Sequence, residues 1–380
     1  MNQEMSGWTM RNAEGRESAQ DGQDVIYLTG ASGSLGSALL EVLVRLPSVK
    51  KMYYAVRGRD PQEKFIQSLK SRGYSADVWG SAKIHAVNYD MEDAGLGLDP
   101  QTYEKVESEV TVVMHNAWKL GFNQPVQQFD EDCLRSTMNL MSFCIKGPKK
   151  TFAFMSSVAA AMGTKGTGGI PELPLGPDPE SALQTGYAQS KFIIEQITQN
   201  YASTFNVPVQ ILRVGQLSGH SQLGACNHTE MWPIMMMTAL DLLSAMPVLQ
   251  TTVDWLPVDM CAEAITDAVL SSTVQGTYAV TNLTNPSTTS WAEFISCLEE
   301  ASGRRLERIE MKDWVSRLEA VADSPSSNGH DIPALKLLGF FQAMAGEDGN
   351  GEGVRFESPK VERGKRIEAD MVRKWLATWK

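Results

Sequence analysis

The sequence lacks a long apolar run, has few cysteines and carries no excess of basic residues. Its longest apolar stretch, at 233–249, is interrupted by Asp241 and is too short to span a bilayer. With 34 Lys and Arg against 45 Asp and Glu, the formal charge of -11 argues against nucleic-acid binding, which needs a basic surface. The five cysteines form no C-x-x-C pair, a usage that fits a reducing compartment and no zinc site. We therefore expect a cytoplasmic protein that binds neither membranes nor nucleic acid.

What the sequence does contain is a regular alternation of apolar strands and amphipathic helices. Strands are expected at 24–30, 51–58, 83–90, 110–118, 151–159 and 208–219, with helices at 35–46 and 61–73 between the first three. Strands that alternate with helices in this way predict an α/β fold, a doubly wound parallel sheet with helices on both faces.

The chain divides into three expected parts. Residues 1–22 are polar and are expected to be a flexible lead-in, and residues 23–225 a nucleotide-binding domain. Residues 226–380 are expected to form a smaller, mostly helical substrate-binding subdomain, although a strand near 276–283 should join the first sheet. Helical segments are expected there at 231–249, within 254–270, and at 290–302 and 311–322.

Three glycines with G-x-x-G-x-x-G spacing follow the first strand and open the first helix. This spacing suits a tight turn, close approach of the backbone to a pyrophosphate, and close packing of helix on strand. The phosphates would then lie at the helix N-terminus, where free N–H groups and the helix dipole favour anions. We expect the cofactor cradle to consist of Gly30, Ser32, Gly33, Ser34, Leu35 and Gly36.

Residues at the ends of the next strands indicate which nucleotide is bound. An NAD-binding protein usually has Asp or Glu after the second strand, whereas this sequence has Arg57, which favours a 2′-phosphate and therefore NADP. Lys64 would add positive charge. Asp90 is placed to accept a hydrogen bond from the adenine, and Asn116 should lie along the ribose and nicotinamide. The expected cofactor contacts are completed by Met91, Ala117, Val214, Tyr187 and Lys191.

A tyrosine and a lysine four residues apart form the expected catalytic pair. Tyr187 and Lys191 would share one face of a helix. We expect the lysine ammonium to lower the pKa of the phenol, so that Tyr187 can donate a proton to a carbonyl that is being reduced. A serine at the end of the fifth strand would hold the same oxygen. The residues leave open whether this serine is Ser156 or Ser157.

Together these features resemble the extended short-chain dehydrogenase/reductase family, which implies a Rossmann sheet with Ser157, Tyr187 and Lys191 as catalytic residues. The segments "HNAWKLGFN", "LRVGQLSG" and "WLPVDMCAEAI" resemble the terminal thioester reductase domains of nonribosomal peptide synthetases and related megasynthases, particularly the fungal type. Two departures stand out. The family's cradle is usually T-G-A-T-G-F-L-G, whereas Ser32 and Ser34 stand here, and Lys64 only approximately replaces the family's second arginine.

The resemblance implies NADPH-dependent reductive release of an acyl or peptidyl thioester from the phosphopantetheine arm of a carrier protein. The product would be an aldehyde, with further reduction to the alcohol left open. The carrier would be an upstream domain of the same synthase, and the reductase domain is expected to be monomeric in isolation. The methionines Met231, Met235, Met236 and Met237 fit either an adaptable acyl pocket or ordinary core packing.

Other functions remain open at this stage. A thioesterase is disfavoured because the sequence lacks the G-x-S-x-G motif of an activated serine. Cyclising release domains that do not use the cofactor tend to lack the tyrosine, so Tyr187 favours reduction. A free acyl-CoA reductase, a sugar-nucleotide epimerase and a non-catalytic NADP-binding sensor are further alternatives; the "NAWKLGFN" segment disfavours the epimerase and the Tyr187–Lys191 pair disfavours the sensor.

Overall fold

The computed structural model describes residues 23–56, 61–90, 92–121, 124–165, 169–271, 277–322, 332–346, 355–357, 361 and 364–379. Its centre is a seven-stranded sheet in the order β3-β2-β1-β4-β5-β6-β11, in which every neighbouring pair is parallel. The strands are β1 Asp24–Thr29, β2 Val49–Val56, β3 Ile84–Asn88, β4 Val112–His115, β5 Thr151–Ser157, β6 Val209–Val214 and β11 Tyr278–Leu283. The predicted doubly wound parallel sheet is therefore confirmed.

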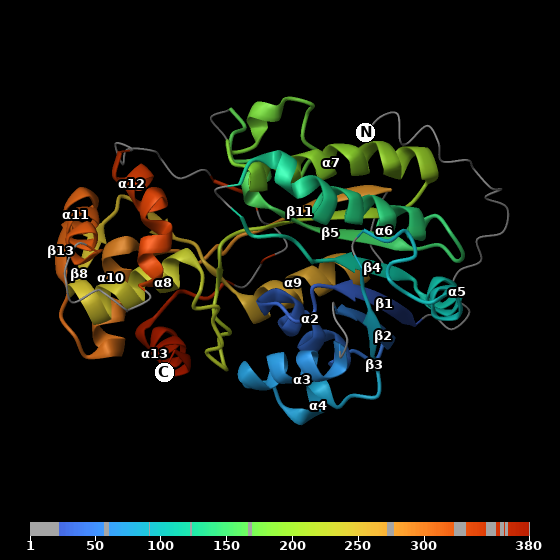
Figure 1. The fold of residues 1–380 in the computed structure, drawn as a ribbon, viewed down its shortest axis with the longest axis horizontal. Coiled ribbons are helices and arrows are strands. Elements are labelled where there is room, and N and C mark those ends of the chain that lie inside the picture. Colours follow the sequence, from blue (N-terminus) through green and yellow to red (C-terminus); the bar gives the residue numbers. More distant parts are fainter. Residues whose placement is uncertain are drawn as a thin grey trace.

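Helices cover both faces of this sheet (Figure 1). One face carries α2 Ser34–Arg45, α3 Pro61–Ser71 and α9 Val258–Leu270, while the other carries α5 Pro100–Glu109, α6 Ser136–Cys144 and α7 Gly186–Phe205. The side chains of a strand alternate between the faces. In β1, Ile26 and Leu28 pack in the core below α2 and α9, whereas Tyr27 packs in the core below α6 and α7. Both faces are buried, which is why the strands are almost continuously apolar.

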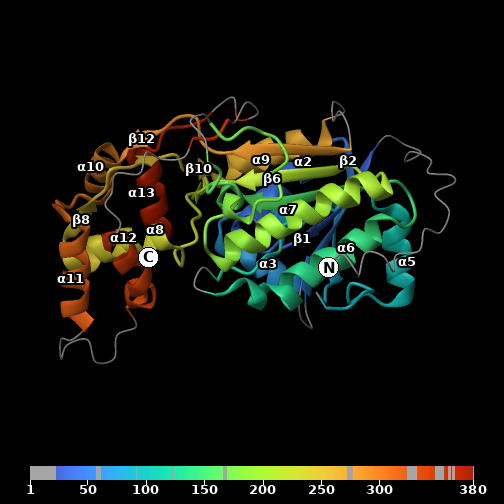
Figure 2. The ribbon, with the colours of Figure 1, turned by 90° about the horizontal axis from the view of Figure 1, so that it is seen from above.

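After β6 the chain leaves the seven-stranded sheet, passes through β7 (Leu217–Ser218) and builds a second lobe, which lies beside the first in two perpendicular views (Figures 1 and 2). The lobe contains α8 Met231–Thr238, η5 Ala239–Leu243, β8 Ala245–Val248, α10 Trp291–Ser302, β13 Glu307–Glu310, α11 Met311–Ala322, η7 Pro333–Leu337, α12 Leu338–Gly346 and α13 Ala369–Thr378. Its apolar core includes four tryptophans, Trp255, Trp291, Trp314 and Trp375. Between its two stretches in this lobe, the chain returns to the first lobe through α9 and β11.

The remaining short elements lie between these helices and strands along the chain. They are α4 Ala76–Trp79, η1 Val126–Phe129, η2 Asp130–Arg135, η3 Val158–Ala160, η4 Pro179–Ser181, β9 Thr252–Val253, β10 Leu256–Pro257 and β12 Thr289–Ser290. Two of the irregular turns, η2 and η5, are π-helical. Among the described residues, no helix combines the length and the apolarity needed to cross a bilayer.

The prediction of a single helix over 231–249 is wrong for the second half of that segment. The helix ends in the π-turn η5, Ser244 takes a left-handed conformation with φ of 50°, and β8 then pairs in parallel with β13. Pro247 lies within this strand, and proline in a helix interior would remove a backbone hydrogen bond. The strand expected over 208–219 is likewise divided into β6 and β7.

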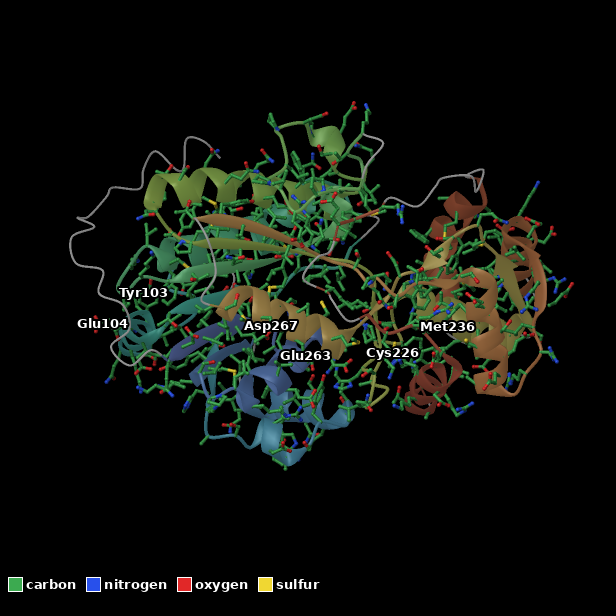
Figure 3. The ribbon with its side chains drawn as sticks, turned by 180° about the vertical axis from the view of Figure 1, so that it is seen from behind. Tyr103, Glu104, Cys226, Met236, Glu263 and Asp267 are labelled. Atoms are coloured by element: carbon green, nitrogen blue, oxygen red, sulfur yellow. The ribbon has the colours of Figure 1, made fainter. Side chains whose placement is uncertain are left out.

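The methionines of α8 divide between core and partly buried positions. Met235 and Met236 are fully buried in the core of the second lobe, and Figure 3 shows Met236 inside that lobe, away from Glu263 and Asp267 on α9. The structure therefore supports core packing for these two methionines. Met231 and Met237 are only partly buried.

Candidate active site

The predicted site residues gather at the carboxyl edge of the parallel sheet. Gly30 follows β1, Asn116 follows β4, Ser157 ends β5 and Val214 ends β6. The strand register brings them together, because Thr29 pairs with His115 and Ser157 pairs with Val214. This edge is where ligands bind in open parallel sheets.

The turn between β1 and α2 packs so closely that only glycine fits at two of its positions. Gly30 has φ of +69°, and a Cβ atom there would lie 2.8 Å from the backbone nitrogen of Ala117. A Cβ on Gly36 would lie 2.1 Å from the carbonyl oxygen of Gly30, so only glycine allows α2 to pack this close to the turn. The helix cap, Gly33, makes no side-chain cap bond, and the first turn of α2 contains no acidic residue. An uncapped helix N-terminus of this kind fits a pyrophosphate.

Behind the glycine turn, a chain of hydrogen bonds joins β1, β4 and η2. The hydroxyl of Thr29 accepts from the backbone N–H groups of Asn116 and Ala117 at 3.1 and 3.0 Å, and therefore donates its own hydrogen to Nδ1 of His115 at 2.9 Å. His115 must then be the Nε2–H tautomer, which donates to Thr137 at 3.1 Å. Thr137 donates in turn to the carbonyl oxygen of Cys133 in η2 at 2.7 Å.

This chain of hydrogen bonds holds His115 as a neutral ring. Burial and, to a lesser extent, the charge of Lys191 together lower the pKa of His115 to about 3. The side-chain amide of Asn116 also donates to the carbonyl oxygen of Gly30 at 3.1 Å. Asn116 and Ala117 therefore hold the glycine turn in place, whereas they were expected only as direct contacts with the cofactor.

The residues expected around the adenosine part of the cofactor are only partly described. Asp90 is exposed beyond β3, with its carboxylate accepting from the backbone N–H of Glu92 at 3.0 Å. Lys64 is exposed on α3, one turn before Ser68, whose hydroxyl donates to the carbonyl oxygen of Ser32 at 2.8 Å. Lys64 thus shares the helix face that contacts the glycine turn. Arg57 and Met91, like the lead-in 1–22, lie outside the described residues.

Ser157 and Tyr187 form the expected hydroxyl pair. The phenol of Tyr187, at the start of α7, is hydrogen-bonded to the side chain of Ser157, whose oxygen also accepts from the backbone N–H of Ala159 at 3.2 Å. The expected lowering of the phenol pKa is wrong for the protein without ligands. Burial raises the pKa of Tyr187 to about 12, the hydrogen bond from Ser157 opposes this shift, and the Glu230 carboxylate adds to it.

Lys191 explains why the phenol pKa is not lowered. Its Nζ atom donates to the carbonyl oxygen of Met155 at 2.6 Å and lies 3.9 Å from the centre of the Trp118 ring, but 5.8 Å from the centre of the Tyr187 ring. Burial lowers the pKa of Lys191 to about 7, against the opposing effects of Cys133 and Glu195. The lysine is thus turned toward the sheet and Trp118 rather than toward the phenol.

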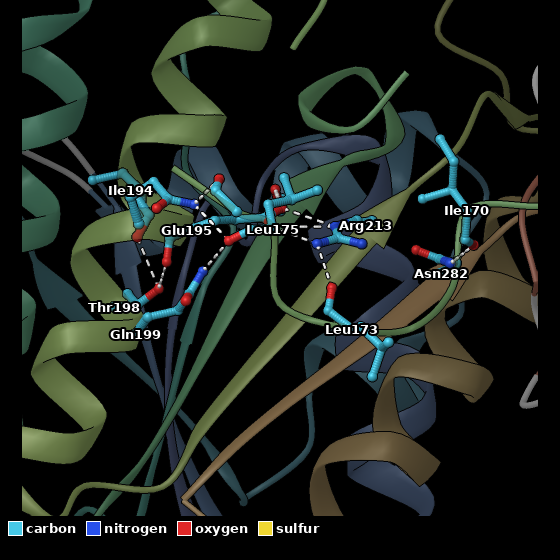
Figure 4. A network of polar contacts seen from close by, with 12 residues as sticks. Ile170, Leu173, Leu175, Ile194, Glu195, Thr198, Gln199, Arg213 and Asn282 are labelled. Carbon is cyan, nitrogen blue, oxygen red and sulfur yellow. Dashed lines mark hydrogen bonds and ion pairs between the residues drawn. The ribbon is translucent and has the colours of Figure 1, made fainter. Parts of the chain in front are cut away.

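Ser156 has a different environment from Ser157. Its hydroxyl donates to Glu195 at 2.6 Å, and Glu195 forms a buried ion pair of 2.8 Å with Arg213 on β6. The Arg213 guanidinium also donates to the carbonyl oxygens of Leu173 and Pro171, at 3.0 and 3.4 Å (Figure 4). This network attaches the loop before α7 to the sheet, so Ser156 takes part in a structural network while Ser157 faces Tyr187.

Four residues of the site were not singled out by sequence reasoning: Thr29, His115, Glu195 and Arg213. Glu195 had a usable signal, since it continues the helix face of Tyr187 and Lys191 at the same spacing of four. The other three gave none, because their partners are far away along the chain.

A comparison with known families shows which family the chain belongs to. The family described as male sterility protein, an NAD-binding domain family, matches residues 28–265. The chain belongs to this family. Members of this family bind a nicotinamide cofactor, which agrees with the glycine turn. The oxidoreductase chemistry of the family agrees with the Ser157–Tyr187 pair.

The sequence similarity of this chain to known reductases confirms the predicted resemblance to reductase domains. The adenylate-forming reductase Nps11 of Serpula lacrymans var. lacrymans (strain S7.9) is 30% identical over 390 residues, which cover 93% of this chain and 34% of Nps11. The chain thus spans about a third of the length of that relative.

Two solved structures share the fold. The terminal R domain from the myxalamid PKS-NRPS biosynthetic pathway superposes with a TM-score of 0.81 at 24% identity, covering 95% of this chain and 91% of that domain. A thiolation-reductase di-domain from an archaeal non-ribosomal peptide synthetase gives a TM-score of 0.74 at 17% identity, covering 94% of this chain and 76% of the di-domain.

Proposed function

We propose that this protein catalyses the NADPH-dependent reduction of an acyl or peptidyl thioester, held on the phosphopantetheine arm of a carrier protein, to an aldehyde. The observation that carries the proposal is the hydrogen bond between Ser157 and Tyr187 at the carboxyl edge of the sheet, beside the glycine turn. Family membership supports the redox chemistry, and the adenylate-forming reductase relative supports an activated acyl group as the substrate.

The residues of the site divide the work of the reaction. NADPH, when bound by the turn from Gly30 to Gly36, supplies the hydride. Tyr187 donates its proton to the carbonyl oxygen, and its pKa of about 12 keeps the phenol protonated at working pH. Ser157 donates a hydrogen bond to the same oxygen, and Lys191 supplies a positive charge below the site. The resulting hemithioacetal collapses to the aldehyde and the carrier thiol.

The preference for NADPH over NADH is proposed from two basic residues. Arg57 follows β2, where an NAD-binding protein would have an acidic residue, and Lys64 lies on the face of α3 that contacts the glycine turn. We expect Arg57→Gln to weaken NADPH binding at least tenfold and to leave NADH binding unchanged. Equal loss for both cofactors would contradict the assignment of Arg57 to the 2′-phosphate.

A carrier protein is the proposed partner. The solved thiolation-reductase di-domain places a thiolation domain and a reductase domain in one chain, and this protein covers 76% of that di-domain. We propose that a carrier domain delivers the thioester to the carboxyl edge of the sheet, where Ser157 and Tyr187 lie.

The proposal is tested by supplying an acyl thioester on pantetheine or on a carrier protein and following the absorbance of NADPH. We expect consumption of NADPH with formation of an aldehyde, and a loss of at least a hundredfold in Tyr187→Phe. Release of a cyclised product without NADPH consumption would identify a cyclising domain, and turnover of free acyl-CoA at the same rate as carrier-bound substrate would identify a free acyl-CoA reductase. NADPH binding without turnover of any thioester would contradict the proposal and favour a non-catalytic NADP-binding sensor.

A further inference from the structure

The ammonium group of Lys191 lies in an aromatic cage. Its Nζ atom is 3.9 Å from the centre of the Trp118 ring and 4.7 Å from the centre of the Phe154 ring, and the Lys191 side chain is only 3% exposed. The hydrogen bond to the carbonyl oxygen of Met155 satisfies one of its three N–H groups. Aromatic faces therefore replace much of the water that an ammonium group normally binds.

The Trp118 ring is itself held in place over the lysine. Its indole N–H donates to the hydroxyl of Ser190 at 3.3 Å, and Ser190 donates to the carbonyl oxygen of Tyr187 at 2.7 Å. The ring also meets the Phe154 and His115 rings edge-on, at centre distances of 5.3 and 5.8 Å. The first turn of α7 thus fixes the ring that covers Lys191.

We propose that Trp118 is a positioning residue of the active site, which holds Lys191 in its charged form by a cation–π contact. The negative face of an indole attracts a cation, and the attraction is strongest where water is excluded. Burial alone favours the neutral amine, which could not supply the positive charge that the reaction requires below Tyr187. Trp118 opposes that effect without adding a carboxylate that would neutralise the charge.

The other groups around Lys191 do not replace Trp118 in this role. On η2, the thiol of Cys133 is buried, and its own pKa is raised by burial, so it is uncharged at neutral pH. On α7, the carboxylate of Glu195 is engaged by Arg213 and Ser156, and the Tyr187 phenol is neutral. On β4, His115 is neutral. The contact with the face of Trp118 is therefore the closest charge-stabilising side-chain contact described for Lys191.

The test compares Trp118→Leu, which removes the ring, with Trp118→Phe, which keeps one. The pKa of Lys191 is measured in the protein without cofactor from the pH titration of its 13Cε resonance, assigned with Lys191→Arg. We expect the pKa to fall by about one unit in Trp118→Leu and to stay within a few tenths in Trp118→Phe. Phe152→Leu is the matched control, because it removes a buried ring from β5 that does not contact the Lys191 ammonium.

A rate measurement gives a second readout, which rests on the proposed reductase function. Reduction of the acyl thioester should decline at high pH as Lys191 loses its proton, and in Trp118→Leu this decline should begin about one pH unit lower. An unchanged lysine pKa in Trp118→Leu, or an equal fall in Trp118→Phe, would overturn the inference. A higher lysine pKa in Trp118→Leu than in the wild type would also overturn the inference, since Trp118 would then act only by excluding water. Because the titration needs no turnover, a protein that reduces no thioester fails the proposed function alone.

Discussion

The hydroxyl of Ser156 donates a hydrogen bond of 2.6 Å to the carboxylate of Glu195, and both side chains are buried. Ser156 shares the strand face of Phe154, which is covered by α7, whereas Ser157 is the last residue of β5 and lies at the edge of the sheet. Two adjacent serines therefore have different neighbours, and their substitutions should have different consequences.

If the proposed mechanism holds, Ser157→Ala should lower the rate of thioester reduction by about a hundredfold and leave the unfolding temperature nearly unchanged, because in that mechanism Ser157 donates one hydrogen bond to the developing oxyanion. Ser156→Ala should leave the rate nearly unchanged and destabilise the fold. It should lower the free energy of unfolding by about 2 kcal/mol, because the buried carboxylate of Glu195 loses a hydrogen-bond donor. Thermal unfolding and NADPH consumption, measured on both variants, separate the two effects. A larger rate loss in Ser156→Ala than in Ser157→Ala would reverse the assignment.

Glu195→Gln should destabilise the protein strongly. The change leaves the guanidinium of Arg213 buried without a counter-charge, and breaking a buried ion pair from one side costs about 3–5 kcal/mol. The loop that contains Leu173 should also loosen, because its carbonyl oxygen depends on Arg213 as a donor. Chemical denaturation measures the first effect, and amide hydrogen exchange over residues 169–176 measures the second.

Lys165→Gln provides the matched control for this prediction. The Lys165–Glu180 pair has the same charges and a distance of 2.7 Å, but both of its side chains are largely exposed. Water screens such a pair, so its loss should leave the denaturation midpoint unchanged. Equal effects of the two substitutions would show that burial of the Glu195–Arg213 pair does not matter.

His115 should make the protein sensitive to acid. In the folded protein the His115 ring stays neutral down to its pKa of about 3, whereas in the unfolded chain it binds a proton near pH 6.5. The unfolded state therefore binds more protons within this window, and the free energy of unfolding should fall as pH falls from 6.5 toward 3, by up to about 5 kcal/mol from this group.

The contribution of His115 is isolated by comparison with His115→Gln, which cannot titrate. The variant should lose less stability than the wild type between pH 6.5 and the acid transition, measured by urea denaturation at a series of pH values. His228→Gln serves as the control, because it removes an exposed imidazole in place of the buried one. Identical slopes in all three proteins would show that His115 does not control the acid response.

Gly36→Ala should abolish NADPH binding. A methyl group at this position would lie 2.1 Å from the carbonyl oxygen of Gly30, so α2 would have to move away from the glycine turn and the phosphate cradle would open. Binding is measured by the fluorescence of NADPH. Gly176→Ala adds the same methyl group where no atom lies within 4 Å, and it should bind NADPH as the wild type does. Normal binding by Gly36→Ala would place the pyrophosphate elsewhere.

Parts of the site that depend on local spacing could be predicted. The three glycines are close in sequence, and Tyr187 and Lys191 are one helical turn apart, so the sequence alone placed them on one turn and one helix face. The pKa of Tyr187 could not be predicted in the same way. Sharing a helix face with Lys191 did not reveal that the lysine side chain turns toward Met155 and Trp118.

The order of apolar and polar residues determined the doubly wound sheet, the glycine turn and the Tyr187–Lys191 helix, because each depends on interactions between neighbours along the chain. Only the tertiary structure decided which serine faces Tyr187, how Arg213 holds the loop before α7, and why His115 is neutral. These features join strands and helices that are 18 to 88 residues apart in sequence. Their hydrogen bonds form only when the sheet buries them together, and burial is also what sets the pKa values of the site.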